Sequence, residues 1–389
     1  MKTNWQTKKF GDVCGFVRGP FGGSLKKSIF KKIGYAVYEQ QHAIYDQFDD
    51  IRYFIDEEKF NEMKRFELKS GDLIMSCSGT MGKIAIIPNN IKRGIINQAL
   101  LKLTPSDGIS NIFLKLWMQS ESFQDSLKKL SKGAAIKNVA SVKILKEIEI
   151  PLPPLPEQRR IVKILDEVFE KVAKAKENTE KNLKNSKELF ESYLQNVFTK
   201  RGKGWEEKKL GEVCKVIAGQ SPEGKFYNKS GKGMPFYQGK KEFGEKYIGA
   251  STTWTTEITK EAEKNDILMS VRAPVGPINF ATQKICIGRG LAAIQAGKDI
   301  NKDFMFYGIL SKEKEIVGNA GAVFASISKT DIENLKFFVP PLSEQKSIVK
   351  KLDALSAETK KLEAIYKKKL ADLEELKKSV LKKAFNGKL

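Results

Sequence analysis

The chain offers few side chains of the types that carry out catalysis. His42 is its single histidine, and its four cysteines form neither a CxxC pair nor a Cys/His set with zinc-ligand spacing. Ser78-Gly-Thr-Met-Gly-Lys83 matches only part of a phosphate-binding loop, because the first glycine and the Ser/Thr after the lysine are missing. Asp56, Glu62 and Lys64 are the residue types of a nuclease site, but they lack its Pro-Asp lead. We therefore expect no catalytic residue and no metal site.

Loops that combine cations, glutamines and glycines are better candidates for function. Lysine and arginine pair with phosphates, and a glutamine amide can form two hydrogen bonds to an adenine edge in the major groove. A glycine-rich turn can also bring the backbone close to a phosphate. In the first half of the chain, the candidate DNA-binding residues are Arg18, Lys26, Lys27, Gln40, Gln41, His42, Ser78 and Thr80.

The second half of the chain contains a corresponding set of polar loops. Its candidate DNA-binding residues are Gln220, Lys225, Tyr227, Gln238, Lys240, Lys241, Arg272 and Arg289. Each set has a structural alternative: a glycine-rich turn is often only a turn, and His42 can be a hydrogen-bonded structural histidine. Arg272 and Arg289 stand beside strand-like runs, where they can also form structural ion pairs.

The charge of the chain favours a polyanionic partner. It has 69 Lys+Arg against 47 Asp+Glu, a net charge of +22, although a lysine-rich surface can also serve solubility alone. Residues 157–200 carry +2 and residues 344–389 carry +6, so +14 remains for the other segments. Most of the excess therefore lies outside these two stretches, where the candidate loops are.

The sequence is duplicated. Residues 5–14 (WQTKKFGDVC) match residues 205–214 (WEEKKLGEVC), and residues 72–76 (DLIMS) match 266–270 (DILMS). Residues 153–166 (PPLPEQRRIVKILD) match 340–353 (PPLSEQKSIVKKLD) at ten of fourteen positions. Three matches in the same order indicate that one unit is used twice.

Each unit has a globular part and a long helix. The globular parts contain short β-type runs broken by Gly and Pro, with a helical stretch over 111–130, which indicates an α+β domain. The second parts contain no Gly or Pro over residues 157–199 and 344–385, and prolines stand directly before these stretches. The predicted boundaries are 1–152 and 201–339 for the two globular domains, 153–200 for a central helix and 340–389 for a C-terminal helix.

The two predicted helices carry apolar residues at heptad spacing. The seam in the second helix runs Ile348, Leu352, Leu355, Thr359, Leu362, Tyr366, Lys369, Leu373, Leu376 and Val380. The seam in the first runs Ile161, Leu165, Val168, Val172, Ala175, Thr179, Asn182, Ser186, Leu189 and Tyr193. We expect the two helices, each about 65 Å long, to pack antiparallel as a coiled coil in a pseudo-two-fold tandem repeat.

Further apolar residues on these helices lie off the seam: Phe169, Phe190, Leu194, Phe198, Leu381 and Phe385. They exceed what one antiparallel pair requires, so we expect them to pack against the globular domains and against a partner. The sequence has no apolar run long enough to cross a membrane and no apolar signal core. With few cysteines at this size, we expect a soluble, intracellular protein without disulfides.

The chain resembles a specificity subunit of a type I restriction–modification enzyme. The resemblance covers the whole chain and rests on the paired PPL-x-EQ-x-x-IVK-x-LD helix starts, on the W-x-x-KK-x-G-x-VC domain openings and on the closing LKKSVLKKAFNGKL, echoed by LFESYLQNVFTKRG. It implies that each globular part is a target recognition domain that reads one half of a split, asymmetric DNA sequence. It also implies that the helices set the spacing and dock two adenine methyltransferase (modification) subunits.

The resemblance implies a non-catalytic subunit of a multisubunit endonuclease and methyltransferase. S-adenosylmethionine, ATP and Mg²⁺ are then expected on partner subunits and not on this chain, and restriction subunits are further expected partners, in a prokaryotic cytoplasm at the nucleoid. The chain itself has no [DN]-PP-[FY] motif of amino-methyltransferases, because leucine follows both Pro-Pro pairs. Two other hypotheses stay open: a coiled-coil scaffold that joins two protein-binding domains, and an autonomous DNA-binding regulator.

Overall fold

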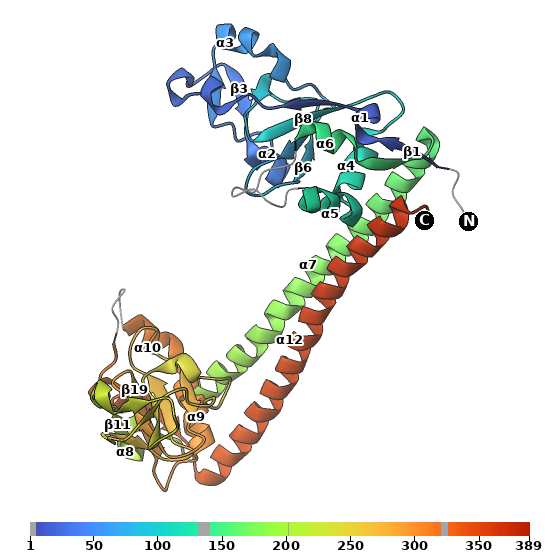
Figure 1. The fold of residues 1–389 in the computed structure, drawn as a ribbon. Helices are drawn as coiled ribbons and strands as arrows, with labels where there is room; N and C mark the ends of the chain where they lie inside the picture. Colours follow the sequence, from blue (N-terminus) through green and yellow to red (C-terminus); the bar gives the residue numbers. More distant parts are fainter. Residues whose placement is uncertain (1–4, 131–140, 201, 320–325) are drawn as a thin grey trace. The chain divides into compact units, whose positions relative to one another are not determined.

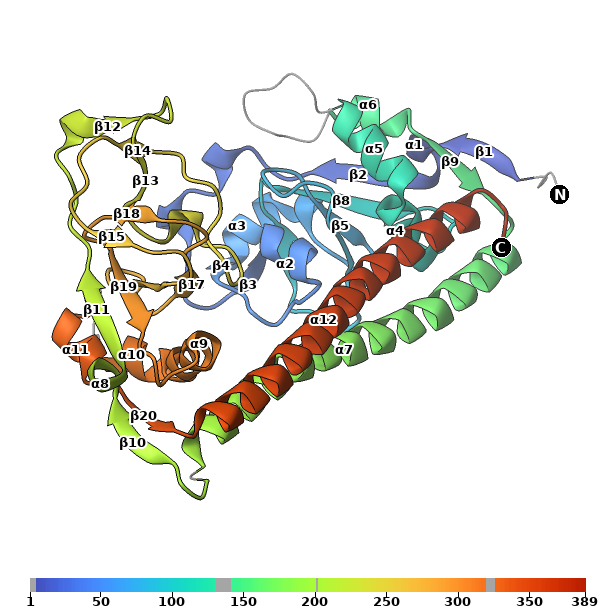
Figure 2. The same ribbon diagram turned by 90° about the horizontal axis from the view of Figure 1, so that it is seen from below.

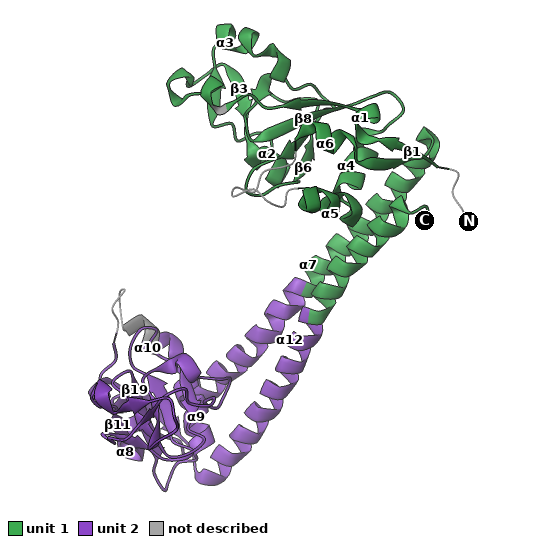
Figure 3. Ribbon diagram, in the orientation of Figure 1, with its two compact units in different colours: residues 1–179, 368–389 green, residues 180–367 purple. Residues whose placement is uncertain are grey.

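The computed structural model describes residues 5–130, 141–200, 202–319 and 326–389 and divides the chain into two compact units. Unit 1 contains residues 1–179 and 368–389, and unit 2 contains residues 180–367 (Figure 3). This division differs from the four segments predicted from the sequence, which separate the helices from the globular domains. Each compact unit instead contains one globular part and the portions of both long helices that pack on it.

Unit 1 is an α+β domain built on two sheets and a strand pair (Figure 1). The main sheet has the order β2-β8-β5-β6 and is antiparallel; its strands are β2 (Cys14–Arg18), β5 (Leu73–Ser76), β6 (Ile84–Ile86) and β8 (Leu100–Pro105). The second sheet has the order β4-β3-β7, from β3 (Tyr35–Tyr38), β4 (Tyr53–Ile55) and β7 (Gly94–Ile96). The strand pair joins β1 (Gln6–Lys9) to β9 (Glu149–Leu152).

The helices of the globular part of unit 1 are short. They are α1 (Phe10–Val13), α2 (Gln40–Tyr45), α3 (Glu57–Glu62), α4 (Asn111–Gln119), α5 (Glu121–Leu130) and α6 (Val142–Lys146). The helical stretch predicted over 111–130 is therefore confirmed, with a break at Ser120, whose backbone leaves the helical region.

Both faces of the main sheet of unit 1 are buried, which explains the uninterrupted apolar run in its central strand. Leu73 and Met75 of β5 point into the core that α4 and α5 cover, while Ile74 between them joins the core on the β3–β7 side. In β8, Leu101 joins the core under α4 and α5, and Leu100 joins the core on the β3–β7 side. Because side chains alternate along a strand, a strand covered on both faces needs apolar residues at every position.

Unit 2 repeats this arrangement. Its main sheet, in the order β11-β19-β16-β17, contains β11 (Cys214–Ala218), β16 (Ile267–Ser270), β17 (Ile278–Phe280) and β19 (Leu291–Ala296). Its second sheet, in the order β12-β14-β13-β18-β15, contains β12 (Tyr227–Asn228), β13 (Met234–Tyr237), β14 (Trp254–Thr255), β15 (Glu261–Ala262) and β18 (Ile285–Ile287). The strand pair joins β10 (Glu206–Lys209) to β20 (Lys336–Val339), and the short helices are α8 (Leu210–Val213), α9 (Lys302–Ser311), α10 (Glu313–Asn319) and α11 (Lys329–Glu333).

The two long helices are α7 (Leu155–Thr199) and α12 (Leu342–Phe385). Within unit 1 they run antiparallel: Lys176 Nζ lies 2.7 Å from Glu374 Oε1, and Arg160 donates to the carbonyl of Leu389 over 3.0 Å. Within unit 2 the directions are again opposite, because Leu194 shares a core with Leu352 while residues 187–191 and 359–363 border one hollow. Figure 2 shows the two helices side by side within each unit. The predicted fold class, two α+β domains in tandem with a pair of long antiparallel helices, is confirmed.

The off-seam apolar residues attach these helices to the globular cores, as predicted for their contact with the domains. Leu381 and Phe385 of α12 belong to the core of unit 1, beside Ile161 and Leu165 of α7. Leu194 and Phe198 of α7 belong to the core of unit 2, and Phe169 and Phe190 pack on the edges of these cores.

The predicted seam is only partly correct. Five seam positions are buried: Ile161, Leu165, Thr179, Leu352 and Thr359. Three seam leucines are instead exposed to solvent: Leu189 (53%), Leu362 (37%) and Leu376 (45%). The predicted seam keeps a strict heptad over each whole helix. In a straight α-helix, residues at heptad spacing drift by about 20° per heptad around the helix axis, so a strict heptad does not stay on the face toward a single partner.

A buried glutamine joins each long helix to its domain. Gln158 accepts a hydrogen bond from Ser110 N (2.8 Å) and donates to the carbonyls of Gly108 (2.9 Å) and Pro153 (2.8 Å). Its side chain is fully buried, and it connects the first turn of α7 to the loop that starts α4 and to the chain after β9.

The same joint recurs in unit 2. Gln345 accepts from Asn301 N (2.7 Å) and donates to the carbonyls of Pro340 (2.8 Å) and Asp299 (3.3 Å). It is also fully buried. These are the glutamines of the repeated EQ pair, so the repeat encodes a helix-to-domain joint. Within the described part of the chain, no helix combines the length and the apolar character that crossing a bilayer requires.

We predict that Gln158→Ala and Gln345→Ala each loosen only their own joint. Each change leaves a buried backbone N–H without its acceptor, which costs about 1–3 kcal/mol of unfolding free energy. Amide hydrogen exchange, with denaturant unfolding as a second measurement, should show faster exchange at Ser110 in Gln158→Ala and at Asn301 in Gln345→Ala. The exposed neighbours serve as matched controls, and Arg159→Ala and Lys346→Ala should leave both amides protected. Unchanged protection at the amide next to the substituted glutamine would contradict the joint.

Candidate DNA-recognition surface

Predicted residues of the second domain converge at one end of the main sheet of unit 2. Tyr227, Gln238, Lys241 and Arg289 line a single open hollow of about 610 Å³. They come from the start of β12, from the segment after β13 and from the turn between β18 and β19, and Ser221 and Pro222 of the loop after β11 complete the lining. Three loops far apart in sequence thus form one polar surface, as their composition suggested.

Ser221 connects these loops. Its hydroxyl donates to Gln238 Oε1 (3.0 Å) and accepts from the backbone N–H of Arg289 (3.1 Å). Sequence reasoning missed Ser221 although it chose Gln220 beside it, because only its position between two other loops gives the hydroxyl its role. Gln220 donates its own backbone N–H to the carbonyl of Ile287 (3.0 Å), so the loop after β11 is fixed to the end of β18.

An aromatic pair forms one wall of the hollow. The ring of Tyr227 is stacked on Phe236 with centroids 4.8 Å apart, and its hydroxyl donates to the carbonyl of Pro222 (2.8 Å). Burial raises the pKa of Tyr227, while Ser221 and Arg289 act to lower it. The phenol is therefore held in place and protonated at neutral pH, close to the positive charge of Arg289.

The other candidates in unit 2 lie outside the lining of this hollow. Lys225 is exposed and forms an ion pair with Glu223 (2.6 Å). Lys240 is exposed at the start of a 3-10 turn (Lys240–Glu242) that also contains Lys241. Arg272 is exposed on the loop after β16, where its backbone forms a bridge with Ser326. DNA contact by each of these residues remains a prediction.

In unit 1 the structure brings two candidate loops together. Gln40 begins α2, and its Oε1 accepts from the backbone N–H of Ser78 over 2.9 Å. Arg18 ends β2 and is partly buried, whereas Lys26, Lys27 and Thr80 are exposed. DNA contact by these residues likewise remains a prediction.

The environment of His42 favours its structural alternative. The ring is 1% exposed, its Nδ1 accepts from Glu39 N (2.8 Å), and its Nε2 lies 3.0 Å from the carbonyl of Asp50. Both nitrogens therefore stabilise the start of α2 and the loop after it. Gln41 also donates to the carbonyl of Asp50 (3.3 Å). In this conformation the His42 ring presents no free edge to a base.

Two exposed residues of unit 1 escaped the sequence reasoning. Phe21 follows β2 and is 92% exposed, more than any other large apolar side chain among the described residues. Gln98 is exposed on the turn between β7 and β8. Phe21 stands within the glycine-rich run already chosen for its cations, so its exposure was a readable signal, whereas Gln98 had none before the turn was known.

The acidic side chains and thiols considered as catalytic or metal-binding candidates have structural roles. Asp56 caps α3 by accepting from Lys59 N (3.0 Å), and Glu62 pairs with the side chain of Lys59 (2.7 Å). Burial raises the pKa of the Cys14 and Cys77 thiols to about 12, so they are protonated at neutral pH. Over the described ranges, no group of three or more His, Cys, Asp or Glu side chains is placed to hold a metal ion.

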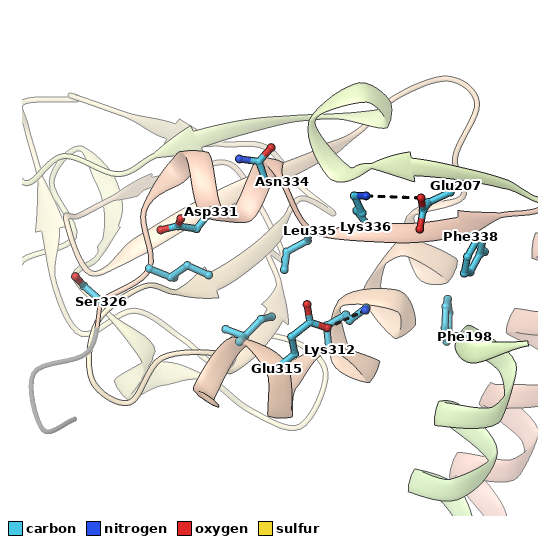
Figure 4. Close-up of a pocket in the computed structure, with 12 residues that line it drawn as sticks. Phe198, Glu207, Lys312, Glu315, Ser326, Asp331, Asn334, Leu335, Lys336 and Phe338 are labelled. Atoms are coloured by element: carbon cyan, nitrogen blue, oxygen red, sulfur yellow. Dashed lines mark hydrogen bonds and ion pairs between the residues drawn. The ribbon is translucent and has the colours of Figure 1, made fainter. Parts of the chain in front are cut away.

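A second recess in unit 2, of about 510 Å³, is less suited to nucleic acid (Figure 4). It lies between the end of α7, the β10–β20 pair, α10 and α11. Both lysines of its lining form ion pairs with carboxylates: Lys336 Nζ lies 3.7 Å from Glu207, and Lys312 Nζ lies 2.8 Å from Glu315. Asp331 adds a further negative charge to the lining, and a phosphate would be repelled there.

Comparison with known proteins identifies the class to which this fold and surface belong. Residues 2–185 and 202–374 each match the family described as type I restriction modification DNA specificity domain. The chain therefore belongs to this family, with two copies of its domain. Sequence recognition of DNA is the function that the family assignment gives it.

The relatives agree over the full length of the chain. The chain is 32% identical over 408 aligned residues to a putative type I restriction enzyme specificity subunit, MjaX, of Methanocaldococcus jannaschii, which covers 99% of this chain and 94% of the relative. The MjaVIII specificity subunit of the same organism is 25% identical, covering 99% and 93%.

Two solved structures share the fold. A chain from a structure on complex assembly and conformational transition of the type I R-M system has a TM-score of 0.85 and 28% identity, covering 99% of this chain and 98% of that one. The HsdS subunit from Thermoanaerobacter tengcongensis has a TM-score of 0.69 and 27% identity, covering 99% and 97%.

We predict that Lys240→Ala combined with Lys241→Ala weakens binding to every duplex sequence alike, because we expect lysines at this surface to contact phosphates and not bases. The slope of log K against log salt should become shallower by up to about 2, since each lost phosphate contact contributes about 0.9. Fluorescence anisotropy over a salt series measures this on the full chain. Lys298→Ala is the matched control. This exposed lysine lies just after the end of β19, whereas the candidate surface lies at the start of β19. An unchanged slope in the double variant would exclude these lysines from the interface.

Proposed function

We propose that the two globular domains of this chain read the two halves of a split, asymmetric DNA target. The observation that carries the proposal is the repeated frame. In each unit the chain after the first main-sheet strand is bonded to the start of the last one, by Gly19 N to Leu100 O and by Gly219 N to Leu291 O, each over 2.9 Å. The two frames are the same, whereas the side chains around them differ, as expected of two readers with different targets.

Electrostatics supports a DNA surface over a protein-binding scaffold. The segments outside the helices carry most of the net charge of +22, and Lys240, Lys241 and Arg289 are exposed at the edge of the candidate surface. Phosphate contacts would supply affinity, and contacts to base edges would supply specificity. Binding to DNA that loses no affinity between low and moderate salt would favour the scaffold hypothesis instead.

In this proposal the helices set the spacing and dock two adenine methyltransferase subunits. Leu189 (53% exposed), Leu362 (37%) and Ile365 (56%) in unit 2 and Leu376 (45%) in unit 1 leave apolar area open on α7 and α12. Exposed apolar area on a long helix is typical of a surface that another helix covers. S-adenosylmethionine, ATP and Mg²⁺ would be held by the methyltransferase and restriction subunits, and the complex would act on the DNA of a prokaryotic cytoplasm.

Replacing residues 1–152 with the corresponding domain of another family member should change one half of the target and leave the other unchanged. The reason is that each domain has its own cores and its own joint, so neither needs the other to form its surface. Sequencing of methylated adenines in DNA exposed to the reconstituted complex reads out both halves. A change in both halves would contradict the assignment of one half to each domain, and methylation without any motif would contradict DNA reading altogether.

Ile365→Glu should release the methyltransferase subunits, because it puts a charge into an apolar contact. Co-purification with tagged methyltransferase measures the loss, which we expect to exceed about tenfold. Ile258→Glu is the matched control, since Ile258 is similarly exposed (48%) but lies on the globular part of unit 2. Equal retention of the methyltransferase by both variants would exclude this part of α12 from docking.

A further inference from the structure

The turn that leads into the last strand of the main sheet is built in the same way in both units. In unit 2, Gly288 N donates to Tyr237 O (2.9 Å), Val271 N to Gly290 O (3.0 Å) and Leu291 N to Gly288 O (3.0 Å). In unit 1, Asn97 N donates to Tyr38 O (2.9 Å), Cys77 N to Ala99 O (2.9 Å) and Leu100 N to Asn97 O (3.3 Å). These bonds place Arg289 and Gln98 at the same position, the middle of the turn.

Neighbouring backbone holds this turn tightly. A Cβ added to Gly219 would lie 2.2 Å from the carbonyl oxygen of Gly288, and one added to Gly19 would lie 1.9 Å from that of Asn97. A Cβ on Gly290 would lie 2.4 Å from the carbonyl oxygen of Gln238. Only glycine, which has no Cβ, can lie this close to the neighbouring backbone. In both units the chain after the first strand is therefore in direct contact with the turn. The residue in the middle of the turn therefore stands on a rigid base.

Arg289 and Gln98 are exposed polar side chains on this base. In the described part of the chain, neither side chain forms a hydrogen bond or an ion pair, although the backbone N–H of Arg289 is bonded to Ser221. A fixed backbone beneath an unpaired side chain suits recognition, because little conformational freedom of the chain is lost on binding.

The two side chains have different and well-defined base preferences. Arginine forms two hydrogen bonds to O6 and N7 of guanine in the major groove, and glutamine forms two to N6 and N7 of adenine. We propose that this turn is the base-reading turn of each domain, with Arg289 recognising guanine in the half read by unit 2 and Gln98 recognising adenine in the half read by unit 1. The inference rests on the proposed function and adds to it which residue reads which base.

A phosphate contact is the competing role for Arg289, and the choice of substitution separates the two. Arg289→Gln removes the charge and supplies the adenine-reading amide found at Gln98. If Arg289 reads guanine, one guanine of the unit 2 half loses its preference by about 5- to 150-fold and adenine gains there. If Arg289 contacts phosphate, binding falls for all sequences and the motif stays the same.

The experiment uses the full chain with its methyltransferase subunits on a randomised duplex library, read out by sequencing of bound and methylated molecules. We expect Arg289→Gln to change one position of one half, and Gln98→Arg to change one position of the other half from adenine to guanine. Lys298→Gln, at the opposite end of β19, controls for loss of charge and should leave the motif unchanged.

The inference is overturned if Arg289→Gln and Gln98→Arg select the wild-type motif, or if Arg289→Gln weakens all sequences equally. A wild-type complex that selects a single undivided motif, or none, would overturn the proposed function itself. The two failures are therefore distinguishable, because the first is read from the variants and the second from the wild type.

Discussion

The hydrogen bonds of two buried glutamine amides hold each long helix to the domain it serves. Gln158 and Gln345 each satisfy one backbone N–H and two backbone carbonyls where the first turn of a helix meets the loop before α4 or α9. A buried amide that satisfies its partners fixes orientation, since any tilt of the helix breaks several bonds in a medium without water. A reading surface is useful only if its angle to the helix is constant, and this joint provides that constancy.

The same frame serves two different surfaces. In both units the main sheet is buried on both faces, so its strands are constrained by packing and have little freedom to vary. The connections at the strand ends carry no such constraint: α2 follows β3 in unit 1, whereas a 3-10 turn (Lys240–Glu242) follows β13 in unit 2. Variation is thereby confined to the loops, while the glycines beneath the reading turn keep its backbone in place.

Much of this architecture was predictable because it rests on local patterns. The repeated DLIMS and DILMS runs indicated short β-strands, and the Pro-Pro-Leu starts with long Gly- and Pro-free stretches indicated the helices. The exposure of Leu362 and Leu376 was not predictable, because it depends on how far each helix pair stays in contact. At the candidate surface, composition identified Gln238, Lys241 and Arg289 but not Ser221 or Gln98. The role of Ser221 comes from hydrogen bonds between loops that are distant in the sequence, and that of Gln98 from its place in the turn between β7 and β8.

The central claim is that the chain holds two separate base readers. Interference by 7-deazaguanine and 7-deazaadenine tests it most directly, because replacing purine N7 by a C–H group removes a major-groove acceptor without changing base pairing. With the full complex on its target duplex, two clusters of interfering purines should appear, one in each half, separated by a stretch where substitution has no effect. A single uninterrupted cluster, or interference in one half only, would contradict the account.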